Sequence, residues 1–219
     1  MTERGGAFCA LRRMQHVLTD SALDYKDFIL AWMQKKKVHL VLGSGGARGT
    51  AHIGVIEILE ENNYEIVSVV GSSMGAIVGG MYAAGYLPGF KEWMLALTKS
   101  IVFNIMDFTL TRQGFLKGER IFSIMQKAIG NHLIENLRIP FTAVATDLLH
   151  GTEVHYTEGD LYKALRASIA IPGVFIPVLN NNQFLIDGAV LNPVPVNVVK
   201  KAANELVVAV DLNGPCCCY

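Results

Sequence analysis

Two glycine-rich turns limit the possible folds of this chain more than any other feature of its sequence. Each turn lies between an apolar run and a helix-like segment. The turn Gly43–Gly49 follows the apolar run Val38–Leu42, and the turn Gly71–Gly75 follows the apolar run Ile66–Val70. Strand–turn–helix order repeated at this spacing favours a parallel sheet with helices on its faces. The expected fold class is therefore α/β, a three-layer α/β/α domain with a mainly parallel central sheet.

The second turn has the spacing G-x-S-x-G, with Ser73 at its centre. A strained strand-to-helix turn of this kind raises a serine hydroxyl above the end of a parallel sheet. The first turn offers consecutive backbone N–H groups at a helix N-terminus, where negative charge is favoured. A raised serine beside free N–H donors is the arrangement that acyl transfer requires.

Apolar periodicity predicts the other elements of the domain. Pro88 is expected to close the unit of the two turns, and the segment 91–130 to be mostly helical with a loop at 109–114. In the first helix Ile53, Ile56, Ile58 and Leu59 are expected to face the core. The expected helices span 50–62, 76–85 and 161–168, and the expected later strands span 141–146, 153–156, 184–186 and 206–210.

Composition favours a globular domain and excludes nucleic-acid binding. A length of 219 residues suits one domain, and a 51% apolar content can fill its core. The 19 basic and 19 acidic side chains cancel, so no overall field attracts nucleic acid. The uncharged windows 66–90 and 167–186 contain glycines, prolines or polar runs, so neither is expected to span a membrane.

The two ends are expected to differ from the domain between them. Residues 1–37 are interpreted as an N-terminal helical arm, 38–212 as the catalytic domain and 213–219 as a cysteine-rich tail. No apolar stretch follows the first arginines, so no secretory signal is expected and the predicted location is the cytoplasm or the membrane periphery. The adjacent Cys216, Cys217 and Cys218 suit neither a disulfide framework nor zinc ligation. They fit either a chance tail or S-acylation that tethers the chain to a membrane.

Ser73 needs a base, and the histidines supply no obvious one. An elbow serine is usually followed in the chain by a carboxylate and then by a histidine, but the last histidine here is His155. A triad of Asp147 with His150 or His155 stays open, although all three lie in one short β-rich segment. Asp187 is the other candidate, because it follows a short strand, and a carboxylate at such a strand end faces the same sheet edge as the elbow.

Four blocks of sequence occur in a fixed order between about Val38 and Leu212. They are Gly43–Gly49, Gly71–Gly75, Ala167–Pro177, and Asp187-Gly188-Ala189 running on to Asn192–Pro195. In this order they resemble the patatin-like phospholipases, in particular the bacterial members. The resemblance implies a patatin-like fold and a Ser–Asp dyad without histidine. Ser73 would be the nucleophile, and Asp187 would orient it and take its proton. No cofactor is implied, and the sequence shows no cluster of metal ligands.

The resemblance also implies roles for the residues around the dyad. The oxyanion loop would be Gly45, Gly46, Ala47 and Arg48, with the arginine fixing the loop or attracting an anionic head group. The glycines that support the motifs would be Gly71, Gly75 and Gly188. A free aspartate has a pKa of ~3.9, so Asp187 is expected to be partly desolvated. Ala189 stands where the family usually has glycine, which is tolerable unless that residue needs a positive φ.

The expected function is hydrolysis of fatty-acyl esters of phospholipids or lysophospholipids. The expected partners are a lipid substrate and, transiently, a membrane surface; self-association is left open. Apolar residues within 103–116 fit a lid or acyl groove, or an ordinary core contribution. The alternative is a catalytically silent binding or regulatory protein of the same fold. Dinucleotide and P-loop motifs do not fit, because Arg48 replaces the last glycine of G-x-G-x-x-G and Thr50 follows Gly49 where lysine is needed.

Overall fold

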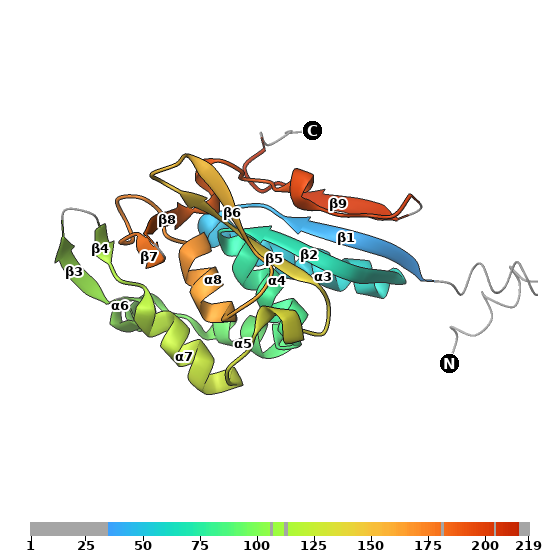
Figure 1. Ribbon diagram of the computed structural model, residues 1–219. Helices are drawn as coiled ribbons and strands as arrows, with labels where there is room; N and C mark the ends of the chain where they lie inside the picture. Colours follow the sequence, from blue (N-terminus) through green and yellow to red (C-terminus); the bar gives the residue numbers. More distant parts are fainter. Residues whose placement is uncertain (1–34, 106, 112–113, 181, 204, 215–219) are drawn as a thin grey trace, which may run out of the picture. The chain divides into compact units, whose positions relative to one another are not determined.

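A seven-stranded mixed sheet forms the centre of the protein in the computed structural model (Figure 1). The structure describes residues 35–214 apart from 106, 112–113, 181 and 204. The strand order is β7-β8-β5-β2-β1-β9, and β6 pairs with β5. The strands are β1 (Lys36–Leu42), β2 (Tyr64–Ser72), β5 (Phe141–Asp147), β6 (Thr152–Tyr156), β7 (Val178–Asn180), β8 (Gln183–Asp187) and β9 (Leu206–Val210).

Four neighbouring strands of this sheet, β9, β1, β2 and β5, run parallel to one another. Strands β6, β8 and β7 complete it in antiparallel pairs. Residues 38–42 of β1 are all buried, which explains why the run is apolar except for His39 and does not alternate; His39 contacts Ser68 and Glu205. The expected α/β class with a mainly parallel central sheet is confirmed.

The helices that pack on the sheet lie together on one face. Helix α3 connects β1 to β2, and α4 begins the connection from β2 to β5, so both crossovers advance in the same direction and right-handed connections put them on the same side. Helix α8 packs on β5 and on α4, and α7 packs on α8 (Figure 1). The helices are α3 (Ala51–Glu61), α4 (Met74–Ala84), α5 (Leu87–Ala96), α6 (Lys99–Ile105), α7 (Glu119–Ile129) and α8 (Leu161–Ser168).

The main core lies between this helical face and the sheet. Leu40 and Leu42 of β1 pack there with Ile56 of α3, Met81 of α4 and Leu165 of α8, and all five side chains are fully buried. Burial of each such side chain contributes about 1.5–3 kcal/mol. The opposite face of β2 and β5 is lined by the segment of the 3-10 turn η4 (Val196–Val198), which follows the 3-10 turn η3 (Gly188–Val190). No α-helix of the described chain lies in this segment, so the second helical layer of the expected α/β/α arrangement is not observed there.

Strands β2 and β8 end against each other on one edge of β5. Positions 143–144 of β5 pair with both β2 and β6, so β2 and β6 lie on opposite edges of β5. Positions 145–147 pair with both β6 and β8, so β8 lies on the same edge as β2. Ser72 is opposite Val144 and Asp187 is opposite Ala145. The last residues of β2 and β8 therefore meet at adjacent positions of β5.

Three details differ from the sequence-based expectations. Residues expected to form a loop at 109–114 contribute to a two-stranded hairpin of β3 (Phe108–Thr111) and β4 (Gly114–Leu116). Pro88 does not close a unit but lies in the first turn of α5, where its missing N–H costs nothing. Ile58 is 57% exposed because it lies two positions, about 200° of helical rotation, beyond the buried Ile56.

Some of the expectations concern the ends of the chain. Lys36 and Lys37, assigned to the N-terminal arm, form the start of β1. The rest of the arm before residue 35, and the cysteines Cys216, Cys217 and Cys218, lie outside the described residues. Within the described chain, every helix is too short or too polar to cross a lipid bilayer.

Candidate active site

The elbow between β2 and α4 holds Ser73 in a strained conformation. Its φ is 56° and its ψ is −124°, a region that non-glycine residues rarely occupy. The Ser73 carbonyl accepts the N–H groups of Ala76 and Ile77, so the residue caps the helix that begins behind it. The turn lifts the side chain out of the line of the strand, as the motif predicted.

The glycines around the two turns are required by close backbone contacts. A Cβ on Gly71 would lie 2.5 Å from the backbone of Ala76, and a Cβ on Gly75 would overlap the Leu42 carbonyl. A Cβ on Gly188 would overlap the Val144 carbonyl. These positions admit no side chain without moving backbone, because real Cβ atoms do not approach so closely.

Ser73 and Asp187 are in direct contact at the meeting point of β2 and β8. The Ser73 hydroxyl donates a hydrogen bond to Oδ2 of Asp187 at 2.6 Å, and the Ala189 N–H donates to Oδ1 at 2.8 Å. The Asp187 N–H donates to the Ala170 carbonyl, which fixes the carboxylate-bearing residue to the end of α8. Ser73 is 5% exposed and Asp187 is 3% exposed.

The environment makes the Asp187 carboxylate more basic than a free one. Burial raises its pKa, and the hydrogen bonds from Ser73 and Ala189, which lower it, do not cancel the effect. The required desolvation is therefore present. Ala189 has no positive φ, so its methyl group is accommodated where the family usually has glycine.

Ser168 is a site residue that the sequence analysis did not single out. Its hydroxyl accepts a hydrogen bond from the Ser73 N–H at 3.0 Å and donates to the Val144 carbonyl at 2.6 Å. It is fully buried at the end of α8, inside the block Ala167–Pro177. The sequence signal that could have identified Ser168 is a serine on the buried side of an expected helix, at the end of that helix. Because the Ser73 N–H is occupied, it is not a free donor for an oxyanion.

The glycine-rich loop presents free backbone donors at the 3-10 turn η1 (Gly46–Thr50). Within the described chain the N–H groups of Gly45, Gly46 and Ala47 have no acceptor, and Gly46 and Ala47 are exposed. The Arg48 N–H differs, because it donates to the Gly45 carbonyl at 3.0 Å. The Arg48 N–H is therefore not a free donor, and the assignment of Arg48 to the oxyanion loop stays a prediction. The other three N–H groups remain candidates.

Backbone contacts brace this loop from three sides. The Gly43 N–H donates to Val210 at the end of β9, and the Ser44 N–H donates to Pro193, downstream of Asp187. On the helical side, His52 of α3 contacts the Gly43 carbonyl through Nε2 at 2.8 Å. His52 is fully buried and burial lowers its pKa, so the ring is neutral and donates this hydrogen bond.

Arg48 contributes to the bracing through its side chain. Its Nη2 donates to Oδ1 of Asn213 at 2.7 Å, and Nδ2 of Asn213 donates to the carbonyl and the hydroxyl of Ser44 at 2.9 Å each. The sequence left two roles open for Arg48, fixing the loop or attracting an anionic head group. These contacts fit the first role. Asn213, assigned to the tail, is thus part of the site's support.

The histidines of the alternative triad form pairs with carboxylates and not with Ser73 in the described chain. His150 pairs with Asp147 at 2.7 Å, and His155 pairs with Glu153 at 2.8 Å. No histidine hydrogen-bonds to Ser73 in the part of the chain that the structure describes. Asp147 also accepts two N–H groups of the following turn, so its carboxylate shapes that turn.

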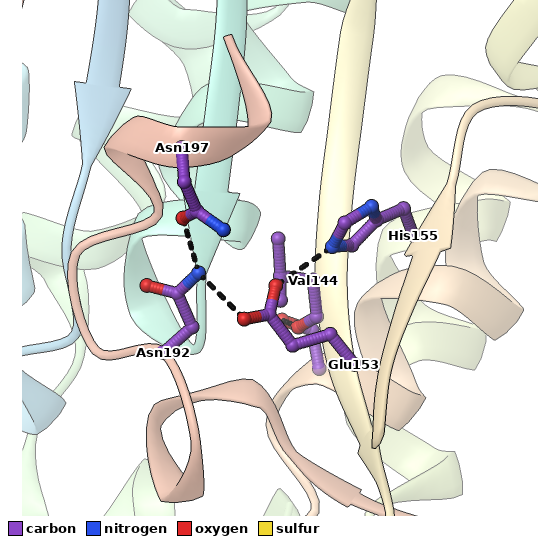
Figure 2. Close-up of polar contacts among 6 residues, drawn as sticks. Val144, Glu153, His155, Asn192 and Asn197 are labelled. Atoms are coloured by element: carbon purple, nitrogen blue, oxygen red, sulfur yellow. Dashed lines mark hydrogen bonds and ion pairs between the residues drawn. The ribbon is translucent and has the colours of Figure 1, made fainter.

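A polar network fixes the segment that follows Asp187 (Figure 2). Glu153 accepts hydrogen bonds from His155 and from Asn192, and Nδ2 of Asn192 also donates to Asn197 at 2.7 Å. The Asn192 N–H in turn donates to the Gly188 carbonyl. The network therefore ties β6 to the turn that carries the carboxylate. Among the described residues, no three acidic, histidine or cysteine side chains are grouped to hold a metal ion.

The fold and the site define a class of α/β proteins in which an elbow serine is paired with an aspartate at the end of a facing strand. Residues 40–200 match the protein family described as patatin-like phospholipase. The chain belongs to the patatin-like phospholipase family.

Curated proteins of the NTE type are similar to this chain in sequence. The uncharacterized NTE family protein Rv1063c of Mycobacterium tuberculosis is 47% identical over 178 residues, which is 81% of this chain and 49% of that protein. Lysophospholipase NTE1 of Yarrowia lipolytica is 28% identical over 93% of this chain and 15% of its own length. The chain thus spans about half the length of this mycobacterial relative.

Among solved structures, VipD from Legionella pneumophila is similar in fold. It superposes with a TM-score of 0.62 at 15% sequence identity, over 80% of this chain and 49% of that one. At this identity the likeness supports the fold and not a shared substrate.

Proposed function

We propose that the chain is a serine lipid acyl hydrolase that cleaves fatty-acyl esters of phospholipids or lysophospholipids. One observation carries this proposal: the strained Ser73 hydroxyl donates at 2.6 Å to a buried carboxylate of raised pKa. A nucleophile and a base within hydrogen-bond reach are the geometric requirement of nucleophilic catalysis. Membership of a lipid hydrolase family, and the lysophospholipase activity that the name of the yeast relative states, support the substrate class.

In the acylation step, Ser73 Oγ attacks the ester carbonyl carbon while its proton passes to Asp187. The carbon–oxygen bond to the alcohol then breaks, and Asp187 returns the proton to the departing oxygen. The products are the free alcohol, here the lysolipid or head-group part, and an acyl group on Ser73.

In the deacylation step, water occupies the place of the alcohol. Asp187 takes one proton from the water, whose oxygen attacks the acyl carbon. The bond to Ser73 Oγ breaks and Oγ recovers the proton from Asp187. The fatty acid is released, and the dyad returns to its starting state.

Both steps pass through a tetrahedral intermediate with a negative oxygen. The N–H groups of Gly45, Gly46 and Ala47 are the donors available to this oxygen, because the N–H groups of Ser73 and Arg48 are occupied. The loop reaches the elbow through Gly49, whose Cα packs on Met74 at the start of α4. Fixed donors of this kind typically contribute about 2.7–4 kcal/mol to transition-state stabilisation.

The nucleophile is tested by intact mass after treatment with a fluorophosphonate. The expected result is one adduct on the native protein and none on the Ser73→Ala variant, because the reagent reacts only with an activated serine. Equal labelling of the variant would assign the reactive group elsewhere. A folded native protein that forms no adduct would support the catalytically silent binding protein instead.

The lipid character of the substrate is tested separately with esters of increasing acyl length. Val190, three residues after Asp187, is an apolar side chain with 51% exposure. The expected result is a kcat/KM that rises with acyl length, since longer chains bury more apolar surface. A flat dependence would remove the support for a lipid substrate while leaving the Ser73 assignment intact.

A further inference from the structure

A cavity of about 640 Å³ lies between α7, the start of α8 and the segment 176–180. Its lining includes no residue of the dyad or of the oxyanion loop. The apolar part of the lining includes Phe122, Tyr156, Tyr162, Val178 and Leu179. The volume lies in the range of sites that hold small ligands.

Arg166 of α8 lines this cavity and is 92% buried, its relative exposure being 8%. Its Nε donates to the Lys117 carbonyl at 2.6 Å, and Nη2 donates to the Ile176 carbonyl at 2.9 Å. The guanidinium also lies over the ring of Phe175 at 5.4 Å. The third nitrogen, Nη1, is buried and has no hydrogen-bond partner among the described residues.

This buried cation also has no counterion in contact. Arg166 forms no ion pair with any described residue. Asp107, one of the two acids that act on it electrostatically, is occupied by the N–H groups of Gly118 and Glu119. A buried charge without a counterion is costly, so an anionic group that enters the cavity beside the Arg166 guanidinium gains a strong interaction.

The charges around the cavity restrict what that anion can be. Lys163 adds a second cation at the lining, whereas Glu119, Glu158 and Asp160 supply three carboxylates. Repulsion from the carboxylates disfavours a free anion of high charge. An anion that carries its own positive charge meets partners of both signs, and the rings of Tyr156 and Tyr162 are suitable neighbours for an ammonium group.

We propose that this cavity binds a zwitterionic phosphate ester, with its phosphate at Arg166 and Lys163 and its ammonium group toward the carboxylates and tyrosine rings. The site is separate from the dyad and does not depend on the proposed hydrolysis. The chemistry fits the head group of a lipid and the corresponding free solute alike, and the experiment below separates the two.

The test is isothermal titration of the Ser73→Ala protein, which prevents any turnover, with glycerophosphocholine. The expected result is saturable binding at least tenfold tighter than that of glycerol 3-phosphate or of choline alone. No saturable binding by folded protein overturns the proposal. Equal affinity for glycerol 3-phosphate overturns the zwitterionic assignment.

Variants link the binding to this cavity. Lys163→Gln removes an exposed charge at the lining and is expected to weaken binding about tenfold, the typical value of a charged hydrogen bond. Lys127→Gln on α7, exposed but outside the lining, is the matched control and is expected to leave the affinity unchanged. Identical affinity in both variants places the ligand elsewhere and rejects the site.

Arg166 is tested by the conservative change Arg166→Lys, because Arg166→Gln leaves the Lys117 and Ile176 carbonyls without donors and endangers the fold. Weakening of at least tenfold, with a thermal unfolding midpoint that still shows a folded protein, supports direct contact with the phosphate. If Arg166→Lys does not fold, Lys163→Gln decides the question alone.

A short-chain lysophosphatidylcholine below its micellar concentration identifies the source of the ligand. Tighter binding than that of glycerophosphocholine assigns a lipid head group, and loss of binding assigns the free solute.

Discussion

At the scale of the residue, burial of Asp187 serves the chemistry and opposes the stability of the fold. The carboxylate is 3% exposed and accepts only two hydrogen bonds, from Ser73 and Ala189. Desolvation therefore raises its pKa, which makes it a better base. The same shift means that the charged form is less stable in the folded protein than in the unfolded chain.

Replacing Asp187 by asparagine separates these two effects. Asp187→Asn can still accept the Ala189 N–H, but its amide donates toward Ser73 Oγ and takes no proton. We expect kcat to fall about 10³-fold or more, since residues of a catalytic unit act together. The unfolding temperature at neutral pH is expected to be unchanged or higher, because no buried charge remains. A folded variant with most of its activity would show that another group is the base.

The raised pKa of Asp187 also predicts how stability and activity depend on pH. A raised folded-state pKa means that the folded form binds more protons, so the group's contribution to stability falls as pH rises from ~3.9 through the folded pKa. We expect the unfolding temperature of Asp187→Asn, relative to the native protein, to rise between about pH 4 and pH 7. Calorimetric melting curves of both proteins at both pH values measure this difference.

The raised pKa of Asp187 also predicts that the acidic limb of the pH–activity profile lies at a higher pH. Activity needs the deprotonated carboxylate, so kcat/KM is expected to decline at a pH above the ~3.9 of a free aspartate. His150 and His155 lie on other contacts, so a limb near the ~6.5 of histidine that disappears on their replacement would refute the dyad.

At the scale of the element, the start of α4 lies so close to β1 that only glycine fits between them. A Cβ on Gly75 would overlap the backbone of Leu42 and Gly43. Because backbone cannot move aside as a side chain can, Gly75→Ala is expected to destabilise the fold by about 2–3 kcal/mol and to displace Ser73. Denaturant unfolding and fluorophosphonate labelling measure the two effects.

Gly54 provides the matched control inside α3. A Cβ there meets no atom within 4 Å, and the residue lies in the interior of the helix. Gly54→Ala is expected to stabilise the protein by about 0.5–1 kcal/mol, because alanine loses less backbone entropy than glycine. Similar losses of stability in both variants would mean that steric contact does not explain the glycine of the elbow.

Local sequence patterns predicted best those helices and strands whose bounds depend on neighbouring residues. The helix 161–168 and the strand 206–210 are observed with those bounds, because apolar period and capping are local properties. The β3–β4 hairpin was missed because its strands are four and three residues long. The antiparallel direction of β8 could not be predicted from local sequence either, because its pairing with β5 joins segments about forty residues apart.

At the scale of the whole molecule, the candidate site is assembled from contacts that no local pattern contains. The proximity of Ser73 and Asp187 was expected from the strand-end rule, but the structure achieves it with an antiparallel strand that meets β2 end to end. Ser168 and Asn213 were missed because their partners are 95 and 169 residues away. Motifs indicated the reacting groups, and tertiary packing determines their support.

Asn213 gives a test of this long-range support. Asn213→Ala removes the hydrogen bonds to Ser44 and Arg48, so the glycine-rich loop Gly43–Gly49 loses one of its supporting contacts. We expect kcat to fall about tenfold with little change in unfolding temperature, because the residue is not part of the core. Asn136→Ala, an exposed asparagine in the 3-10 turn η2 (Ile134–Asn136), is the control. Equal activity of the two variants would show that Asn213 does not support the site.

The end-to-end meeting of β2 and β8 has a consequence for the protein during its synthesis. Ser73 leaves the ribosome 114 residues before Asp187, and the two come together only when β8 has docked on the free edge of β5. A nascent or misfolded chain therefore carries its serine without a base. The proposed dyad can therefore form only after the chain has been synthesised and folded beyond β8.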